Sequence, residues 1–310
     1  MTEYLIGVDG GGTKTDGLCT DLAGHVLTKS TSGPTSLTAT TLGLASMNLV
    51  ETFRQLTSEL TGEVSFPKVV IGIAGLDTPE EKQHAEDVFH EVLAEYQIGS
   101  LSIVNDIQLV LAAQAKKDNA IALIAGTGSQ CFGKRADGVT ARTSGMDYLL
   151  ADQGSGYEIG RLTLRAATCS YDGRTQHSIL EEMVLRHFEV QSFDELKSRV
   201  YFPVLNKAQV AELAKVCVEA FVQYDHAAVK IMDQVVIDLV EMAEAVIRRL
   251  ELQNESADLV CSGSIAKLPA VFDQLKSQLC AKYANLEVHT LESEPAYGAI
   301  RLAMKELQGV

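Results

Sequence analysis

The sequence lacks several patterns that would place it in a common functional class. Its six cysteines include no Cys-x-x-Cys pair, so neither a zinc ribbon nor a thioredoxin-like redox site is indicated. Scattered thiols are typical of reduced, mostly buried cysteines in a cytoplasmic protein. No apolar run reaches about 18 residues, and no basic segment followed by an apolar one opens the chain. We therefore expect a cytoplasmic protein without a membrane partner.

Basic residues are scarce relative to acidic ones. The chain has 26 lysines and arginines against 41 aspartates and glutamates, which gives a formal net charge of −15. This balance argues against nucleic acid as a partner, because proteins that bind it use positive charge to neutralise phosphates. A small anionic ligand remains open, because backbone N–H groups that converge in a turn bind anions locally.

The order of the expected elements occurs twice, and no linker rich in proline or serine separates the copies. Each copy follows the α/β order βββαβαβα, and 310 residues suit two domains. We expect these domains at 1–116, with the last helix at 294–310 added, and at 117–293, which extra helices enlarge. The expected elements are strands at 4–9, 15–20, 25–30, 68–74 and 101–105 with helices at 37–60, 80–96 and 106–116, then strands at 120–125, 130–135, 139–143, 258–262 and 286–289 with helices within 156–249 and at 269–282 and 296–307.

A loop rich in glycine and threonine follows the first strand of each copy. The first is GVDGGGTKT, residues 7–15, and the second is IAGTGSQ, residues 124–130. A strand follows each loop, whereas a P-loop needs a helix there, and Thr13 interrupts the P-loop pattern between Gly12 and Lys14. Plain hairpin turns are the alternative interpretation, since glycine pairs are common in them. Two loops at matching places favour two clamps on one phosphate-bearing ligand between the halves.

The residues of the first loop suit phosphate. Gly10, Gly11 and Gly12 let N–H groups approach oxygen atoms without a side chain in the way. Thr13 and Lys14 can add a hydroxyl and a positive charge.

Asp9 ends the strand before this loop and is placed to hold Mg²⁺ through water, because that ion prefers oxygen ligands. The alternative is a hydrogen bond to its own turn.

Paired loops in a duplicated frame resemble the actin, hexokinase and heat-shock-chaperone ATPase superfamily. The resemblance is greater to its BadF/BadG/BcrA/BcrD ATPase branch, which contains N-acetylglucosamine kinase, and it covers nearly the whole chain. It implies two ribonuclease-H-like, actin-like ATPase domains around a cleft. It also implies transfer of the γ-phosphoryl group of ATP, with Mg²⁺, to the 6-hydroxyl of an amino sugar, first of all N-acetylglucosamine. The segments that carry the resemblance are GVDGGGTKT at 7–15, GIAGLD at 72–77, VNDIQLVLAA at 104–113, ALIAGTGSQCFG at 122–133, LLADQGSGYEIGRLTLRA at 149–166, CSGSIAK at 261–267 and EPAYGAIRLA at 294–303.

Asp106 matches the catalytic aspartate of this family. It follows a buried strand and opens a helix, at the end of the sheet where α/β proteins bind ligands. A carboxylate there can accept the proton of a sugar hydroxyl. The alternative is that Asp106 caps the helix, a role that Asn105 can take instead.

The resemblance also implies contacts with ATP and with the sugar. For Gly263 the alternative is an ordinary turn from strand to helix, and for Asp152 it is a solvated loop acid. The expected ATP-binding residues are Gly10, Gly11, Gly12, Thr13, Lys14, Gly126, Thr127, Gly128, Gly263 and Ser264. The expected sugar-binding residues are Ser36, Asn105, Asp106, Gly128, Ser129, Gly145, Met146 and Asp152.

One segment departs from animal N-acetylglucosamine kinases. Those proteins carry Gly-Gly-Trp-Gly and then Gly-Asp-Glu-Gly-Ser, whereas this chain has SGMD at 144–147 and ADQGS at 151–155. The chain has no tryptophan, and Met146 fills the same space less rigidly. Gln153 replaces an acid, which favours an acetylated amine over a free one. Glucosamine and N-acetylmuramic acid remain alternative acceptors.

Two other functions are compatible with the resemblance. The first is an iron–sulfur activator ATPase of a 2-hydroxyacyl-CoA dehydratase, but that family carries a cysteine where this chain reads LLADQGSG at 149–156. The second is a non-catalytic sensor of sugar or nucleotide, which would not need both Asp9 and Asp106. A homodimer is also possible, because the helix at 80–96 and the long helix from 225 could each face a partner.

Overall fold

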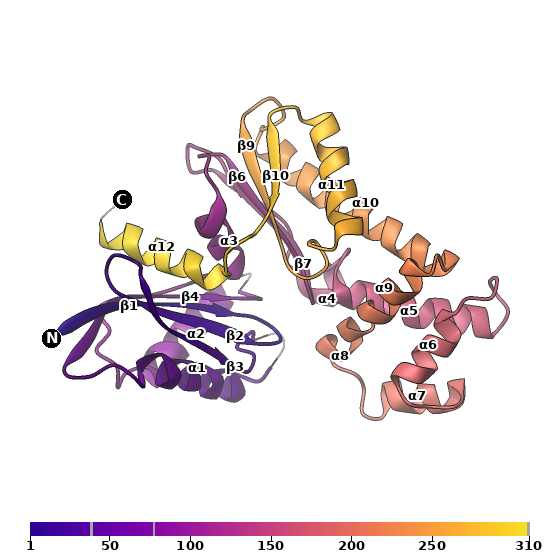
Figure 1. Ribbon diagram of the computed structural model, residues 1–310, viewed down its shortest axis with the longest axis horizontal. Coiled ribbons are helices and arrows are strands. Elements are labelled where there is room, and N and C mark those ends of the chain that lie inside the picture. The colour runs from indigo at the N-terminus through magenta and orange to yellow at the C-terminus, as the bar shows by residue number, and fades with distance from the viewer. Residues whose placement is uncertain (38–39, 77, 309–310) are drawn as a thin grey trace.

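The structure, a computed structural model, describes residues 1–37, 40–76 and 78–308 and contains one five-stranded sheet in each half of the chain (Figure 1). The first sheet has the order β3-β2-β1-β4-β5 and the second the order β10-β9-β6-β7-β8. The strands are β1 (Thr2–Gly10), β2 (Thr15–Thr20), β3 (Val26–Ser32), β4 (Val64–Ile73), β5 (Leu101–Asn105), β6 (Ala120–Ala125), β7 (Ser129–Lys134), β8 (Thr140–Ser144), β9 (Ala257–Ser262) and β10 (Leu286–Thr290).

The two sheets are built alike. In each, three strands form an antiparallel meander, and two further strands pair in parallel beside the first strand of that meander. Strands β1, β2, β3, β4 and β5 thus correspond to β6, β7, β8, β9 and β10. The duplicated α/β fold expected from the sequence is confirmed.

Helices cover both faces of the first sheet, which explains the nearly continuous apolar sequence of β4. Val69 and Ile71 face a core shared with α1 and α2, whereas Val70 faces a core shared with α3 and α12. A strand buried on both faces has no solvated side on which polar residues would alternate. The helices of this half are α1 (Leu42–Thr57), α2 (Pro79–Val92), α3 (Asp106–Gln114) and α12 (Pro295–Leu307).

The last helix returns to the first half of the chain (Figure 1). Ala296, Ala299 and Ile300 of α12 are fully buried in a cluster with Leu5 of β1 and Leu109 of α3. The sheets are joined by residues 115–119, between α3 and β6, and by residues 291–294, between β10 and α12. The domain boundaries expected at 116 and 293 remain predictions.

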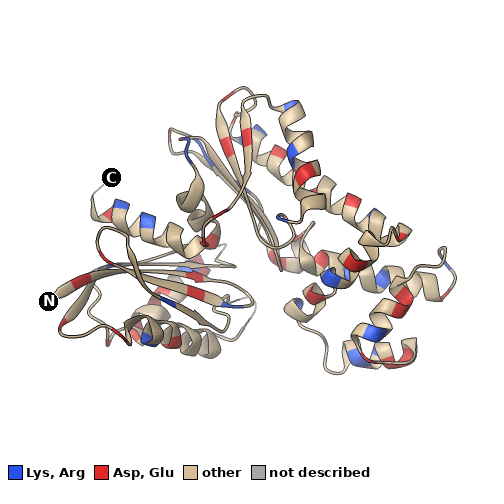
Figure 2. Ribbon diagram, viewed as in Figure 1, with Lys and Arg blue, Asp and Glu red and all other residues tan. Residues whose placement is uncertain are grey.

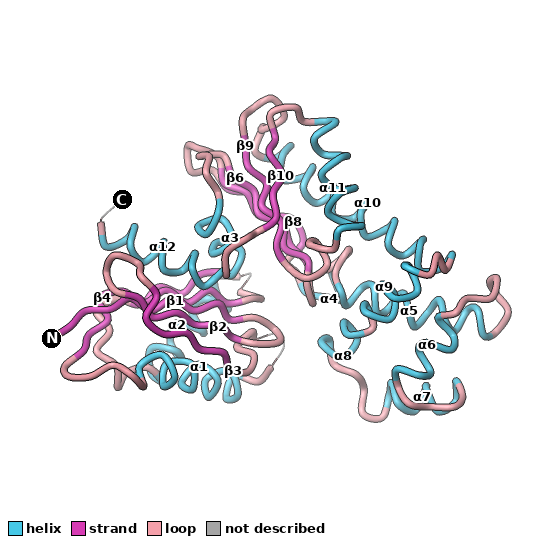
Figure 3. Tube along the Cα trace, viewed as in Figure 1, coloured by secondary structure: helices cyan, strands magenta, loops and turns pink. Residues whose placement is uncertain are grey.

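Helices inserted between β8 and β9 enlarge the second half (Figure 3). The longest is α10, whose apolar stripe includes Val236, Leu239 and Val246 and packs into the large core of this half. The helices of the second half are α4 (Asp147–Leu150), α5 (Gly156–Tyr171), α6 (Leu180–His187), α7 (Phe193–Tyr201), α8 (Lys207–Glu212), α9 (Ala214–Val222), α10 (His226–Arg249) and α11 (Pro269–Lys282).

The helix expected at 37–60 is shorter in the structure. It begins at Leu42, after Thr41 caps its N-terminus by accepting a hydrogen bond from the N–H of Leu44. The residues before it serve the first glycine loop instead, because the N–H groups of Thr35 and Ser36 donate to the carbonyl of Gly11. Residues 38 and 39 lie outside the described part of the chain.

Acidic positions occur on helices and strands of both halves (Figure 2). The negative charge is therefore not confined to one domain. Within the described ranges, no helix combines the length and the apolar character that crossing a membrane requires.

Candidate active site

A cavity opens where the two halves meet, and its wall carries loops from both. The first half contributes the β1–β2 loop, Ser36, Gly75 and the start of α3, and the second half contributes the β6–β7 loop and the segment after β8. The lining residues are Gly11, Gly12, Ser36, Ala74, Gly75, Asp106, Ile124, Gly126, Thr127, Gly128, Ser129, Gln130, Gly145, Asp147, Asp152 and Lys207. Carboxylates from both halves therefore share one cavity with the two glycine loops.

Asp106 is the first residue of α3, and its neighbour takes the capping role. The side chain of Asn105 accepts a hydrogen bond from the N–H of Ile107 and donates one to the carbonyl of Leu76. Asp106 is thereby spared the capping of its own helix, and its carboxylate lines the cavity. The choice between Asn105 and Asp106 as the cap is settled in favour of Asn105.

Gln130 connects the second half to this carboxylate. Its side-chain N–H₂ group, carried on β7, donates to Oδ1 of Asp106 at 2.9 Å and to Oδ1 of Asn105 at 3.1 Å. The side chain is 8% exposed. A hydrogen bond to a charged acceptor is stronger than one between neutral groups, so Gln130 fixes the orientation of Asp106 across the junction of the halves.

Asp9 lies at the end of β1 in an unusually unfavourable environment for a carboxylate. Burial and the negative charges of Asp106 and Asp16 raise the pKa of Asp9 to about 8, and Lys14 opposes the rise only in part. Carboxylates that crowd together without enough positive charge suit a divalent cation, which takes oxygen ligands. The residues present therefore fit Mg²⁺ at Asp9.

The β1–β2 loop uses part of its own backbone to close the hairpin. The N–H of Gly11 donates to the carbonyl of Lys14 at 2.9 Å, and the carbonyl of Gly10 accepts from Ala74. The ammonium of Lys14 pairs with Asp16 at 2.6 Å, and its side chain is 63% exposed. Gly11 and Gly12 of this loop line the first cavity, and Thr13 lines the second.

The β6–β7 loop is backed by a helix that comes later in the chain. The carbonyls of Gly126 and Thr127 accept hydrogen bonds from Gly156 and Tyr157, the first two residues of α5. The N-terminus of α5 thus lies directly behind this loop. The N–H groups of the first turn of α5 are used by these carbonyls and by Ser155, so the positive end of the helix dipole is what favours negative charge near the loop.

The segment between β8 and α5 carries the acidic part of the cavity. Asp152 is 3% exposed, and its Oδ1 accepts a hydrogen bond from the N–H of Ser129 at 3.0 Å. Its Oδ2 lies 2.6 Å from the ammonium of Lys207, which also pairs with Asp147. Asp152 is therefore held on both oxygens and is not the solvated loop acid of the alternative interpretation.

A second cavity adjoins the first at Gly126 and Thr127. Its volume of about 670 Å³ lies within the range of about 300–1,000 Å³ usual for small-molecule sites. One wall is the segment after β9, with Ser264, and the opposite wall is formed by α8 and α9. The helical wall consists of Ala208, Ala211, Glu212, Ala214, Lys215, Val218, Glu219 and Val222.

Gly263 has a structural requirement of its own. Its φ of 91° is in the left-handed region, and a Cβ atom there would collide with the carbonyl oxygen of Ala125. The same carbonyl accepts hydrogen bonds from Ile265 and Ala266. Gly263 therefore forms a tight turn from strand to helix, which brings Ser264 to the second cavity. The contact of Gly263 with ATP stays a prediction.

Residues 6–303 match the model of the BadF/BadG/BcrA/BcrD ATPase family. The chain belongs to this family. It is 29% identical to an N-acetylmuramic acid/N-acetylglucosamine kinase of Clostridium acetobutylicum over 98% of this chain and 99% of that relative. It is 27% identical to an N-acetyl-D-glucosamine kinase of Dictyostelium discoideum, over 97% of this chain and 98% of that relative.

Solved structures show the same fold for this member of the BadF/BadG/BcrA/BcrD ATPase family. A candidate N-acetylglucosamine kinase from Chromobacterium violaceum superimposes with a TM-score of 0.77 at 23% identity, covering 98% of this chain and 99% of that one. A ROK family glucokinase from Streptomyces griseus, solved with glucose and AMPPNP, gives a TM-score of 0.61 at 15% identity, covering 99% and 100%. The actin-like ATPase architecture expected from the sequence is confirmed.

Most of the residues selected from the sequence of this family member meet at the two cavities. Ser36, Asp106, Ser129, Gly145 and Asp152 line the first together with both glycine loops. Met146 is 56% exposed. The residues that line neither cavity are Asp9, Gly10, Lys14, Asn105, Met146 and Gly263.

The sequence contained signals for some of the residues that it did not single out. Ala208, Ala211 and Ala214 recur at the spacing of one helical face, and small side chains on such a face leave room for a ligand or a neighbouring element. Gln130 is the last residue of the segment IAGTGSQ at 124–130, which carries the second glycine loop. Lys207 had no such signal, because the two aspartates that it contacts are about 55–60 residues away in the chain.

Proposed function

We propose that this chain transfers the γ-phosphoryl group of ATP to the 6-hydroxyl of an amino sugar, with N-acetylglucosamine as the first candidate acceptor. The observation that carries the proposal is the position of Asp106: it opens α3, leaves the capping of that helix to Asn105, and lines the cavity shared by the two glycine loops. Both relatives matched over nearly the whole chain bear the names of kinases that act on N-acetylated amino sugars.

The nucleotide fits along the two cavities. The adenosine would lie between Ser264 and the small side chains of α8 and α9. Its phosphates would run past Thr127, which lines both cavities, toward Gly12. The N-terminus of α5 behind the β6–β7 loop favours negative charge there.

The sugar would occupy the first cavity beside Asp152 and Asp106. Asp106 accepts the proton of the 6-hydroxyl while that oxygen bonds to the γ-phosphorus, and the bond from phosphorus to the bridging oxygen of ADP breaks. Such transfers depend mainly on positioning and on neutralising the phosphates. Gln130 supports the first of these by holding Oδ1 of Asp106.

Mg²⁺, which we also propose, would neutralise charge on the phosphates when bound with ATP. Asp9 would hold it through water, and the crowding of Asp9 by Asp106 and Asp16 supports this assignment.

N-acetylmuramic acid is a second candidate acceptor. The observation that favours it is the name of the Clostridium acetobutylicum relative, which includes both sugars. Glucosamine is a third candidate, because Asp147 and Asp152 place negative charge at the cavity.

A coupled assay of ADP release, run with each sugar in turn, tests the proposal. We expect ADP release that requires Mg²⁺ and is fastest with N-acetylglucosamine. The 6-phosphate product would be identified by mass spectrometry and NMR. If none of the three amino sugars caused ADP release, the proposed function would be contradicted and a sensor would be favoured.

The iron–sulfur alternative has little support from the cysteines. Burial raises the pKa of Cys131 and Cys261, so both are protonated thiols at neutral pH. Within the described ranges, the side chains that could jointly hold a metal ion are Asp258, Glu287 and His289, and Lys117 already pairs with Glu287 at 2.8 Å.

Several expectations from the sequence remain predictions. They are a cytoplasmic location, a homodimer, and the lack of nucleic-acid and membrane partners.

A further inference from the structure

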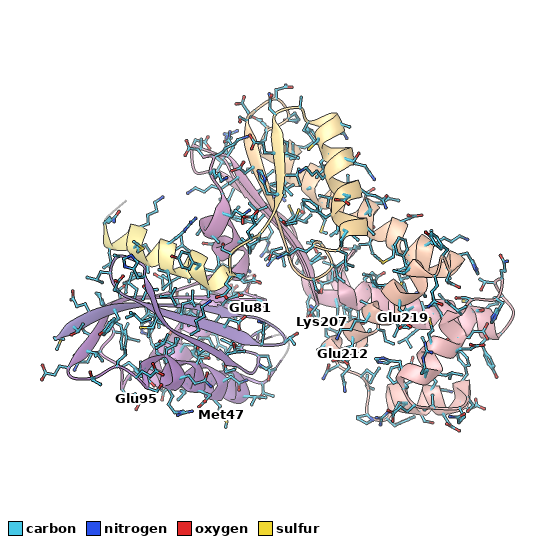
Figure 4. The ribbon with its side chains drawn as sticks, viewed as in Figure 1. Met47, Glu81, Glu95, Lys207, Glu212 and Glu219 are labelled. Atoms are coloured by element: carbon cyan, nitrogen blue, oxygen red, sulfur yellow. The ribbon has the colours of Figure 1, made fainter. Side chains whose placement is uncertain are left out.

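Lys207 is the basic side chain of the cleft for which the sequence assigns no role. It opens α8 and is labelled at the edge of the second half in Figure 4. Among the described residues that line the first cavity, it is the single lysine or arginine, whereas Asp106, Asp147 and Asp152 are acidic. Among these described lining residues, Lys207 therefore supplies the positive charge that faces the three carboxylates.

The contacts of Lys207 are close and largely shielded from water. Its ammonium lies 2.6 Å from Oδ2 of Asp152 and 2.5 Å from Oδ1 of Asp147, and its side chain is 14% exposed. Burial lowers the pKa of Lys207, but Asp152 and Asp147 outweigh that effect and the pKa is raised overall. The side chain is therefore a permanent cation, and the carboxylate of Asp152 is held at both oxygens.

These ion pairs close a strained loop. Asp147 and Asp152 mark the two ends of the segment that contains α4, and Lys207 contacts both. Their φ angles are 57° and 68°, and that of Ser144 just before the segment is 60°. Non-glycine residues in the left-handed region persist only where the surroundings hold them, and they gather at functional sites. Lys207 supplies such a restraint at both ends of the loop.

The ammonium of Lys207 also lies close to Gly128 of the β6–β7 loop. A Cβ atom on Gly128 would be 3.1 Å from Nζ of Lys207 and 3.0 Å from Oδ2 of Asp152. The helix that carries Lys207 is fixed, because a Cβ on Gly160 of α5 would collide with the carbonyl of Val210. Close packing against Gly128 and between α8 and α5 therefore fixes the position of the ion pair between Lys207 and Asp152.

We propose that Lys207 is a positioning residue for the acceptor sugar: it keeps Asp152 aimed at the cavity and holds the 147–152 loop closed around the sugar. This inference rests on the proposed function, because it takes Asp152 to contact the sugar. Without the ammonium, a buried carboxylate and its neighbour Asp147 would lose their counter-charge. Asp152 would then lose its fixed orientation, and a sugar hydroxyl would lose a well-placed acceptor.

Steady-state kinetics of Lys207→Met, with the sugar and ATP varied separately, tests this role. We expect the KM for the sugar to rise at least about tenfold, the effect usual for losing a hydrogen bond to a charged group. The KM for ATP should stay within about twofold, because α8 keeps its place against α5. Lys197→Met, at an exposed position of α7, is the matched control and should match the wild type. A sugar KM within about twofold of the wild type would overturn the proposal.

A double-mutant cycle with Asp152→Asn shows whether Lys207 acts through Asp152. In the Asp152→Asn background, removing Lys207 should raise the sugar KM by clearly less than it does in the wild type, because only its pair with Asp147 is then left to lose. If the rise in sugar KM of the double mutant equalled the product of the rises in the single mutants, Lys207 would contact the substrate separately from Asp152. That result would overturn the proposal.

Lys207→Arg retains the charge and provides the second variant if Lys207→Met melts far below the wild type. We expect its sugar KM to lie within about threefold of the wild type, since a guanidinium can pair with both carboxylates. A rise of about tenfold or more in this folded variant would count against a role based on charge. If the wild-type protein released no ADP with any amino sugar, the proposed function itself would be contradicted. An active wild type with an unchanged sugar KM in Lys207→Met would contradict the role of Lys207 alone.

Discussion

The two halves share one strand order but use their first hairpins differently. Each hairpin closes on its own backbone, since the N–H of Gly11 donates to the carbonyl of Lys14 and the N–H of Gly126 donates to the carbonyl of Gly128. In the first half, the segment behind the loop is not a helix, and its Thr35 and Ser36 N–H groups donate to the carbonyl of Gly11. In the second half, the β6–β7 loop lies on the N-terminus of α5, and Gly126 and Thr127 line both cavities. The two loops are therefore alike, and what differs is the segment that backs each of them: residues 35–36 in the first half and the N-terminus of α5 in the second.

The difference extends to the side chains. The first half contributes Asp9 and Asp106, which suit a metal ion and a general base. The second half contributes Asp152, Lys207 and the helical wall of the second cavity, where we propose that the nucleotide binds. We infer that the first half performs the chemistry and that the second half recognises the ligands. Substitutions in the first half should then lower kcat, and those in the second half should raise KM, except at Gln130, which acts on Asp106 of the first half.

The largest expected effect is that of Asp106→Asn. Turnover should fall at least about a hundredfold, because an amide cannot accept the hydroxyl proton. Binding of ATP and sugar should stay near normal, as measured by calorimetry. Asp118→Asn, on the exposed segment after α3, is the control. Equal turnover of Asp106→Asn and the wild type would refute the assignment of the base.

Asp152→Asn should act on binding instead. The new amide would direct its N–H₂ group or its weaker oxygen at Lys207 and at the sugar, so one charged hydrogen bond is lost. At about 1.5–3 kcal/mol for such a bond, the KM for the sugar should rise about ten- to a hundredfold. Initial rates at varied sugar give this value, with Asp137→Asn in the exposed β7–β8 turn as the control. A pure loss of kcat would contradict the division of roles between the halves.

Gln130→Leu tests the contact that joins the halves. Loss of the N–H₂ donor removes the 2.9 Å hydrogen bond that orients Asp106. We expect kcat to fall about tenfold, with little change in the KM for ATP. Gln130→Glu should be worse than Gln130→Leu, since it sets a second carboxylate beside Asp106. If the glutamate variant were the more active, Gln130 would not act as a donor to Asp106.

Ala211→Leu should have the smallest effect. Ala211 lines the nucleotide cavity and lies near Gly156, so a larger side chain narrows the space for adenosine. Overpacking of about 1 kcal/mol would raise the KM for ATP about fivefold. The KM for the sugar should not change. Val222→Ala, on the exposed rim of the same cavity, should affect the KM for ATP less. A rise in the sugar KM as large as the rise in the KM for ATP would mean that α8 and α9 do not form a separate nucleotide wall.

Much of the fold was readable in the sequence because local patterns dictate it. The apolar run at β4 predicted a strand buried on both faces, and the repeated βββαβαβα order predicted two matching sheets. The helix expected at 37–60 was too long at its start, because Thr35 and Ser36 bond to Gly11 rather than continue a helix. That bond joins segments about 25 residues apart, so no local pattern reports it.

By itself, the sequence determined the two glycine loops and the acid at each key strand end, and it left the cap of α3 open between Asn105 and Asp106. Those features depend on neighbours in the chain, whose geometry residue type and spacing largely fix. Only the tertiary structure decided that α5 stands behind the second loop, that Gln130 reaches Asp106 and that Lys207 pairs with Asp152. Each of these contacts joins residues more than 20 positions apart, and packing rather than local preference brings such residues together.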